Sequence, residues 1–285
     1  MNTAEFNSPN KPTWCPGCGN YAILLALKNA LAERDCNPKD TVIVSGIGCS
    51  GKLPHFAKTY AYESLHGRAL PVATGIKLTN HTLKVIAVGG DGDGYGIGMG
   101  HFIHCMRRNI DITYIVHNNQ IYGLTTGQAS PTSEKGAKTK STPHGVIEIP
   151  INPISLAIAT GATFVARGFS GDLKHLTSLF SQAIAHKGFS LVDVLQPCVI
   201  FNKINTYSFF QKNCYKLEEQ NHNPEDKIAA FQKSLEWGEG KIPIGIFYRE
   251  SRPTYEDELP TIQKTPLHRH DISNVNIERL LDEFE

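Results

Sequence analysis

Two groups of residues in this sequence have the types and spacing of metal-binding sites. The first combines the Cys-x-x-Cys pair Cys15 and Cys18 with Cys49, which follows a Gly-rich turn. The second combines Asp91, in a Gly-Asp-Gly turn, with Asn119 further along the chain. Thiolates select iron or zinc, whereas carboxylate, amide and carbonyl oxygens select a hard cation such as magnesium. A chain with both kinds of site is expected to join an electron-transfer centre to a phosphate-bearing cofactor, which predicts an enzyme.

The acidic turn places Asp91 and Asp93 where a phosphate group would bind. A dinucleotide-binding loop of an NAD-dependent enzyme is the simplest alternative, but no Gly-x-Gly-x-x-Gly frame fits between Gly89 and Gly100. Neighbouring carboxylates repel each other and a phosphate, and a divalent cation removes this conflict by bridging their oxygens. The turn therefore predicts a cation–phosphate site, with Asn119 available as a second ligand.

The cysteine group needs a fourth thiolate if it holds an iron–sulfur cluster. Cys15 and Cys18 precede a predicted helix, whose N-terminal N–H groups favour bound thiolate. A zinc site would more often show a second Cys-x-x-Cys or a His pair, and a thioredoxin-like dithiol would need a preceding strand. Position favours Cys198, which directly follows a predicted strand, although spacing alone leaves Cys214 open. The candidates for the fourth thiolate are Cys36, Cys105, Cys198 and Cys214.

Strands that alternate with helices are predicted to position these residues. Apolar residues at helical spacing predict helices over 21–34, 99–108 and 173–186. Apolar, β-branched runs predict strands over 41–47, 84–88, 113–116, 162–166, 190–195 and 242–247. This order predicts an α/β fold, a parallel sheet with helices on both faces. Ligands of such sheets bind at the carboxyl ends of the strands, which is where the metal-binding turns lie.

The composition narrows the classes of partner and compartment. Of the 285 residues, 28 are basic and 27 acidic, so the net charge of +1 favours neither nucleic acid nor an anionic membrane as partner. The polar start has no apolar secretory signal, and no apolar run approaches the ~20 residues of a membrane helix. Seven cysteines without such a signal favour a reducing compartment. We therefore expect a cytoplasmic protein.

Several segments together resemble the β subunits of the 2-oxoacid:ferredoxin oxidoreductases. The Gly-Asp-Gly turn with its downstream Asn is also similar to the signature of thiamine diphosphate enzymes in general. Ile200 stands where the family pattern has Thr, at a position that binds no metal. The matching segments are 14–19, 46–50, 66–77, 90–93, 118–123, 126–128, 130–132 and 196–202.

The resemblance implies a thiamine diphosphate-binding fold and assigns roles to particular residues. Mg²⁺ would be held by Asp91, the Asn119 side chain and the Ile121 carbonyl. One [4Fe-4S] cluster would be held by Cys15, Cys18, Cys49 and Cys198. Residues implied to reach the thiamine are Ile47, Gly48, Cys49, Ser50, His66 and Gly67, and those implied to line the phosphate pocket are Gly92, Asp93, Gly123 and Leu124.

The resemblance also implies an activity and partners. The expected reaction is oxidative decarboxylation of a 2-oxoacid to an acyl-coenzyme A and CO₂, with electrons passed through the cluster to ferredoxin. Segment 47–52 and the short chain favour 2-oxoglutarate, with pyruvate next, and Lys52 is the candidate cation for the substrate carboxylate. His66 is a second candidate catalytic residue.

The carboxylate that activates the aminopyrimidine ring is expected on a partner α subunit, in a heterodimer or a dimer of heterodimers. Residues 1–214 would form the thiamine diphosphate and iron–sulfur domain, and 215–285 an extension that contacts a partner subunit. A non-redox thiamine diphosphate-dependent decarboxylase subunit and a zinc-binding, non-catalytic scaffold are the alternatives.

Overall fold

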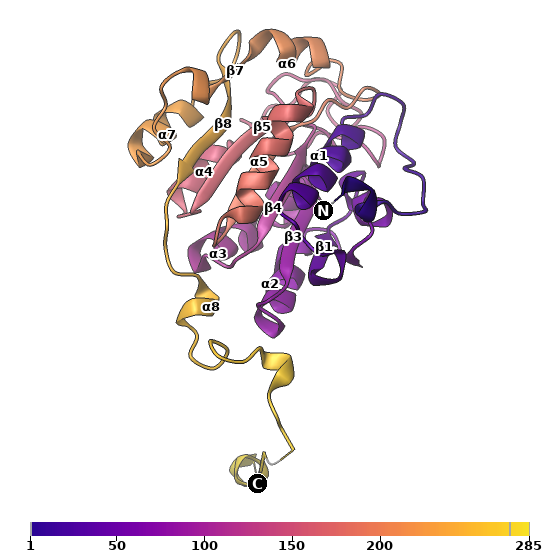
Figure 1. Cartoon of the computed structure of the whole chain (residues 1–285). Coiled ribbons are helices and arrows are strands. Elements are labelled where there is room, and N and C mark those ends of the chain that lie inside the picture. The colour runs from indigo at the N-terminus through magenta and orange to yellow at the C-terminus, as the bar shows by residue number, and fades with distance from the viewer. Residues whose placement is uncertain (1, 274, 285) are drawn as a thin grey trace.

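One mostly parallel sheet forms the centre of the protein (Figure 1). The computed structural model describes residues 2–273 and 275–284. Within them, eight strands pair in the order β2-β1-β3-β4-β6-β5-β8-β7. Pairing is parallel from β2 to β5, whereas β8 is antiparallel to β5 and parallel to β7. The strands are β1 (Thr41–Ser45), β2 (Tyr60–Glu63), β3 (Lys84–Gly90), β4 (Thr113–Asn118), β5 (Phe164–Phe169), β6 (Ser190–Leu195), β7 (Cys214–Lys216) and β8 (Ile242–Arg249).

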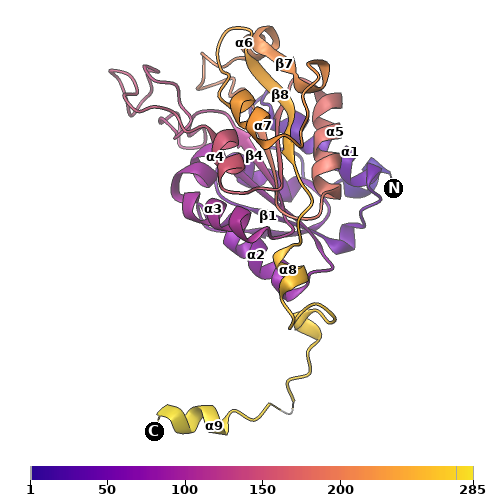
Figure 2. The same cartoon turned by 90° about the vertical axis from the view of Figure 1, so that its left-hand side faces the viewer.

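Helices cover both faces of this sheet, as predicted. Helices α1 and α5 lie on one face, and α2, α3 and α4 lie on the other (Figure 2). Successive strand residues point to opposite faces, so Ile43 packs in the α1–α5 core and Val42 and Val44 pack in the α2–α4 core. The helices are α1 (Asn20–Glu33), α2 (Ala69–Thr79), α3 (Met99–Arg108), α4 (Pro153–Ala159), α5 (Leu173–Ala185), α6 (Tyr207–Asn213), α7 (Lys227–Ser234), α8 (Tyr255–Glu258) and α9 (Glu278–Leu281).

The structure shifts one predicted strand and adds one helix that was not predicted. The strand predicted over 162–166 is observed at Phe164–Phe169, because the N–H of Ala162 instead donates to the Ala157 carbonyl and closes the end of α4. Helix α2 was missed by apolar periodicity, since its sequence contains Pro71 and Gly75. Pro71 is tolerated there because it lies in the first turn, where backbone N–H groups have no partner within the helix.

Four loops that carry the predicted site residues follow adjacent strands of the sheet. They come after β1, β3, β4 and β6, which are neighbours in the strand order. Parallel strands end at the same edge, so residues from about 46, 91, 119 and 196 onward meet there. The turns after β1 and β3 are short helical segments, η3 (Ser50–Phe56) and η4 (Gly92–Ile97).

The strands beyond residue 214 continue the same sheet at its β5 edge, through β8 and then β7. The domain boundary at 214 stays a prediction. In the described part of the chain, no helix combines the length and apolar character needed to cross a membrane.

Candidate coenzyme and electron-transfer site

Two adjoining pockets lie at the carboxyl edge of the sheet. The first, which we call the Asp91 pocket, has a volume of about 240 Å³. It is lined by Ile47, Gly48, Cys49, Ser50, His66, Gly90, Asp91, Gly92, Asp93, His117, Asn119, Ile121, Tyr122, Gly123, Leu124, Thr125 and Gln196. The second, the cysteine pocket, has a volume of about 210 Å³. Its walls include Trp14, Cys15, Cys18, Cys49, Lys52, Cys198, Val199, Ile200 and Phe201.

The two pockets share part of their walls. Both are lined by Cys49, Asn119, Gly123, Leu124 and Gln196. The structure therefore brings together every residue predicted for the metal sites and, except Gly67, every residue predicted to contact the coenzyme. The thiols and the acidic turn, which are far apart in the sequence, belong to one composite site.

Asp91 is a buried carboxyl group without a cationic side chain among its described hydrogen-bond partners. It is 1% exposed, and the Thr132 hydroxyl lies 2.6 Å from its Oδ2. Burial raises the pKa of Asp91 to about 6, while hydrogen bonds from Ser130 and Thr132 lower it and the nearby Asp193 raises it. A divalent cation at this position would supply the missing positive charge and favour the ionised carboxylate.

The loop after β4 presents Asn119 and Ile121 to the Asp91 pocket. The Asn119 Oδ1 accepts a hydrogen bond from the Ile121 N–H at 3.1 Å, and the Asn202 side chain donates to the Asn119 carbonyl at 3.0 Å. Gln120 between them has a positive φ of 57°, in the left-handed region, and the Ser133 hydroxyl donates to its carbonyl. This sharp turn brings both Asn119 and Ile121 to the wall of the Asp91 pocket.

Asp93 organises the pocket wall through one oxygen. Its Oδ1 accepts the Gly67 N–H at 2.7 Å and the Ile47 N–H at 3.1 Å, and lies 2.8 Å from the His66 Nδ1. Its Oδ2 lies beside Gly46, where a Cβ atom would come within 1.9 Å. Asp93 lines the pocket, and its carboxylate contacts three protein groups from two segments, one at Ile47 and one at His66 and Gly67. Gly67 contributes through this backbone bond.

Four of the seven cysteines gather at the cysteine pocket. Cys15, Cys18, Cys49 and Cys198 all line it, and all seven cysteines are free. The pKa of Cys18 is raised to about 11, mainly by burial. A backbone hydrogen bond at Asn20 lowers it, and the neighbouring thiols of Cys198, Cys49 and Cys15 contribute to the rise. The pKa of Cys49 is also raised, mainly by burial and then by Cys198. The nearby Lys52 ammonium lowers it by a smaller amount. The thiols are thus near enough to influence one another.

Gly123 lies between the two pockets and faces the sulfurs. A Cβ atom at this position would be 3.7 Å from the Cys198 Sγ, 3.8 Å from the Cys49 Sγ and 3.7 Å from the Asn119 Nδ2. Because glycine leaves this space open, the backbone can approach a group bound between the thiols and the Asp91 pocket.

The other three cysteines lie elsewhere. Cys214 lines a separate pocket with Phe169 and Phe210, and burial raises its pKa to about 12. Cys105 is buried within α3, and Cys36 follows the far end of α1. Of the sequence candidates for a fourth thiolate, only Cys198 joins Cys15, Cys18 and Cys49 on the wall of the cysteine pocket.

The structure places Lys52 on the wall of the cysteine pocket, outside the set that lines the Asp91 pocket. His66 lines the Asp91 pocket, where its ring makes an edge contact with Tyr122 at a centroid distance of 6.1 Å. The proposed roles of these two residues in catalysis stay predictions.

Several pocket residues had no role assigned from the sequence, among them Gln196, His117 and Tyr122. The Gln196 side chain lines both pockets and its Nε2 lies 3.4 Å from the Cys18 Sγ. His117 lines the Asp91 pocket, and burial lowers its pKa to about 3, so its ring is neutral. The Tyr122 hydroxyl donates to the Gly92 carbonyl at 3.0 Å. All three lie in or directly beside segments of the family resemblance. Their positions at the ends of predicted strands could have identified them as pocket residues from the sequence.

A single metal ion has no ready-made thiolate site in this pocket. Among the described residues, no three His, Cys, Asp or Glu side chains are close enough to hold one metal ion.

Comparisons with known proteins agree with this arrangement. Residues 46–194 match the family model of the thiamine pyrophosphate enzyme, C-terminal TPP binding domain. Residues 198–264 match the family model of the C-terminal part of the pyruvate ferredoxin oxidoreductase beta subunit. The 2-oxoacid:ferredoxin oxidoreductase subunit beta of Saccharolobus solfataricus is 52% identical over 259 residues, which cover 86% of this chain and 85% of that relative. This chain belongs to the 2-oxoacid:ferredoxin oxidoreductase β subunit family.

Two further relatives are similar to this chain over most of its length. The 2-oxoglutarate synthase subunit KorB of Archaeoglobus fulgidus is 44% identical over 191 residues, 67% of this chain and 71% of that relative. A solved 2-oxoglutarate:ferredoxin oxidoreductase from Magnetococcus marinus, with 2-oxoglutarate, coenzyme A and succinyl-CoA bound, superposes with a TM-score of 0.91 and 38% identity. That superposition covers 100% of this chain and 96% of the other. The family resemblance is confirmed, and the chain is one subunit of an oxidoreductase that acts with partner subunits.

Proposed function

We propose that this chain holds thiamine diphosphate, Mg²⁺ and one [4Fe-4S] cluster in the β subunit of a 2-oxoglutarate:ferredoxin oxidoreductase. The observation that carries the proposal is the shared wall of the two pockets, where Cys49, Asn119 and Gly123 line both. An electron donor in the Asp91 pocket and an acceptor in the cysteine pocket would be separated by only a few atoms. A decarboxylase without electron transfer has no use for that arrangement.

Asp91, the Asn119 side chain and the Ile121 carbonyl would hold Mg²⁺ on the diphosphate. Asp91 fits this role because it is buried and its hydrogen-bond partner Thr132 is neutral, so the ionised form gains stability from a cation. The three oxygen donors are of the kind that magnesium prefers. Asp93 would act by positioning, since it ties the turns at Ile47 and Gly67 to the acidic turn.

When bound, thiamine diphosphate supplies the carbanion chemistry that removes CO₂ from a 2-oxoacid. This chain's residues would enclose it: Ile47, Gly48 and Ser50 on the β1 side, and Gly123 and Leu124 on the β4 side. His66 is held by Asp93 at the pocket wall, in position to donate or accept a proton.

Cys15, Cys18, Cys49 and Cys198 would hold the cluster. The donor set is soft, the thiols line one pocket, and Gly123 leaves room beside the Cys49 and Cys198 sulfurs. The raised pKa of Cys18, about 11, means that its thiol is protonated in the metal-free protein, so cluster loading releases protons. Seven free cysteines agree with a reducing compartment, and we place the enzyme in the cytoplasm.

The remaining components would come from partners and substrates. A partner α subunit is inferred from the names of the relatives, and it would supply the carboxylate for the aminopyrimidine ring. Lys52, with a cationic side chain beside Cys49, would bind a substrate carboxylate. We favour 2-oxoglutarate, because the Archaeoglobus relative and the solved Magnetococcus enzyme are both named for it, with pyruvate next. Coenzyme A would accept the acyl group, and ferredoxin the electrons.

The proposal is tested first by iron and acid-labile sulfide analysis with low-temperature EPR on the anoxically purified α–β complex. We expect about four irons per β chain and an EPR signal that appears on reduction with dithionite. Zinc, or no metal in a careful anoxic preparation, would contradict the electron-transfer role. Rates with 2-oxoglutarate and pyruvate, compared as kcat/KM with ferredoxin as acceptor, then decide the substrate; a higher value for pyruvate would overturn the preference for 2-oxoglutarate.

A further inference from the structure

The C-terminal arm, which the structure describes over residues 271–273 and 275–284, extends away from the body of the protein (Figures 1 and 2). Its large apolar side chains are exposed, among them Ile272 at 76% and Phe284 at 90%. Within the described part of the arm, the hydrogen bonds present stay inside the arm, for example from the Val275 N–H to the Ile272 carbonyl. Contiguous exposed apolar side chains of this kind mark an interaction site.

The end of the arm has the pattern of an amphipathic helix. Ile277, Leu280, Leu281 and Phe284 follow the spacing i, i+3, i+4 and i+7, which places them on one face of a helix that includes α9. All four are more than half exposed. Acidic residues surround this stripe, because residues 271–285 contain five acidic side chains and one basic side chain. An amphipathic helix with these anchors fits an apolar groove with a basic border.

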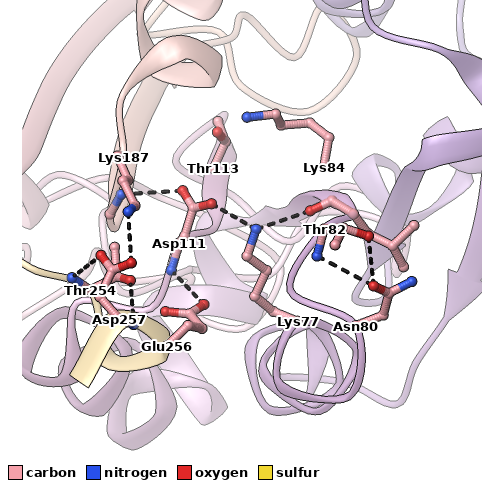
Figure 3. A network of polar contacts seen from close by, with 12 residues as sticks. Lys77, Asn80, Thr82, Lys84, Asp111, Thr113, Lys187, Thr254, Glu256 and Asp257 are labelled. Atoms are coloured by element: carbon pink, nitrogen blue, oxygen red, sulfur yellow. Dashed lines mark hydrogen bonds and ion pairs between the residues drawn. The ribbon is translucent and has the colours of Figure 1, made fainter. Parts of the chain in front are cut away.

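The segment that precedes the arm is fixed to the body by a network of polar contacts (Figure 3). The Asp111 N–H donates to the Glu256 Oε1 at 3.1 Å, and the Lys187 ammonium lies 2.7 Å from the Asp257 Oδ1. Asp111 is held in turn by the buried Lys77 at 2.6 Å. The last described hydrogen bond to the body joins the His268 Nδ1 and the Thr79 carbonyl at 3.2 Å, at the end of α2. The arm therefore departs from a defined point beside α2.

A groove on the α2–α4 side of the sheet has the complementary character. It has a volume of about 530 Å³ and is lined by six apolar residues and by the polar Asn152 and Ser155. The apolar residues are Met99, Ile103, Ile151, Leu156, Ala159 and Phe231, from α3, α4, α7 and the segment before α4. Arg107 lies four residues after Ile103 on α3 and therefore on the same face. With the exposed His104 and Arg108, it gives one border of the groove a basic character.

We propose that the arm docks in the α3–α4–α7 groove of a second copy of this chain in the assembled enzyme. The apolar stripe would fill the groove, and the acidic residues would face Arg107 and Arg108. An extended arm of this length spans at most roughly 50 Å, enough to cross to a neighbouring subunit. A reciprocal exchange of arms uses both complementary surfaces in a two-fold assembly. The superposition with the Magnetococcus enzyme spans the whole chain, so the arm is included in the similarity.

Docking on the chain's own groove is less consistent with the arm's course. The contacts of Glu256, Asp257 and His268 fix its origin beside α2, and from there it leads away from the body (Figure 2). The proposal that the arm docks on a second copy of this chain does not depend on the redox chemistry proposed above, since it concerns only the contact between two β chains.

Photo-crosslinking identifies the occupant directly. Phe284 is replaced by p-benzoylphenylalanine in one of two differently tagged β chains, which are co-expressed with the α subunit and irradiated as the intact complex. We expect an adduct between the arm of one β chain and a peptide of α3, α4 or α7 from the other. An adduct with the α subunit, an adduct within the same copy, or no adduct would overturn the proposal.

Matched variants measure how much the contact between arm and groove contributes to association of the two halves of the complex. Leu281→Asp on the arm and Phe231→Asp in the groove should each raise the dissociation constant between the two halves of the complex about tenfold or more, because each places a charge in an apolar contact. Leu281→Met, which keeps the apolar volume, should leave it nearly unchanged. Iron content should stay constant in all three variants. An unchanged dissociation constant for Leu281→Asp, or an equal effect of Leu281→Met, would contradict the docking.

Discussion

The imidazole of His66 and the carboxylate of Asp93 form a close pair, with Nδ1 and Oδ1 2.8 Å apart. Because a carboxylate only accepts hydrogen bonds, the pair makes Nδ1 the proton-bearing nitrogen of a neutral ring. The same Oδ1 accepts N–H groups from Ile47 and Gly67. One acidic side chain thus sets the tautomer of a pocket histidine and the position of two pocket turns.

Replacing Asp93 should show how far the pocket depends on the hydrogen bonds that its carboxylate accepts. Asp93→Ala leaves the N–H groups of Ile47 and Gly67 without their acceptor, which costs about 1–3 kcal/mol for each group that stays buried. We expect the affinity for Mg²⁺–thiamine diphosphate to fall about tenfold or more, as measured by calorimetric titration. Asp93→Asn keeps an acceptor oxygen and should retain most of the affinity. Wild-type affinity in Asp93→Ala would show that the pocket does not depend on this carboxylate.

The raised pKa of Asp91 predicts how the stability of the metal-free protein depends on pH. The carboxyl group titrates near 3.8 when unperturbed and at about 6 in the folded chain. Between these values the folded protein keeps a proton that the unfolded chain has released, so the free energy of unfolding falls as the pH rises from about 4 to about 6. One group contributes a slope of about 1.4 kcal/mol per pH unit there. Urea unfolding at several pH values should show this slope reduced in Asp91→Asn.

The same proton competes with the metal. Since Mg²⁺ binds the ionised carboxylate, the affinity for Mg²⁺–thiamine diphosphate should fall by up to about tenfold per pH unit below about pH 6, and change little through Asp91 above it. Asp91→Ala should abolish magnesium-dependent binding while leaving iron content intact. A binding curve that is flat between about pH 5 and about pH 7 would argue against Asp91 as a metal ligand.

Two cysteine substitutions test the thiolate set. Cys198→Ala removes a thiol from the cysteine pocket, whereas Cys214→Ala removes one from the separate pocket beside Phe169 and Phe210. We expect Cys198→Ala to lose much of its iron and its EPR signal, and Cys214→Ala to keep both. The reverse result would move the fourth ligand to Cys214 and would require a rearrangement of β7.

Gln196 should influence the reduction potential of the cluster. Its Nε2 lies 3.4 Å from the Cys18 Sγ, and hydrogen bonds to cluster sulfurs stabilise the reduced state. Gln196→Leu should therefore shift the potential to a more negative value in an EPR-monitored titration, without loss of iron. Cys214→Ala is the matched control and should leave the potential unchanged. A shift to a more positive value would show that the side chain acts on the cluster in another way.

The segments that carry the candidate site residues could be predicted without a structure, because their residue types and spacing depend on neighbours in the sequence. The turn at Asp91 follows a buried strand and has glycines that allow close backbone approach, and the Cys15–Cys18 spacing is the one expected for two thiolates on one turn that bind a common group. Apolar runs likewise predicted β3, β4 and β6, at the ends of which these residues lie, since burial on both faces leaves a continuous apolar signal. The family and the chemistry expected of both pockets therefore followed from the sequence.

Tertiary structure decided what depends on distance between strands. Spacing left Cys198 and Cys214 open, and the order of the sheet separates them: β6 ends beside β4 and the pockets, whereas β7 lies at the outer edge beyond β8. The pairing of His66 with Asp93 has no sequence signal, because the segments after β2 and β3 meet only when the parallel strands align their carboxyl ends. The contact of Gln196 with Cys18 likewise depends on the fold, which brings the start of α1 beside the end of β6. The reversed β8 was also hidden, since a buried strand has the same apolar pattern in either direction.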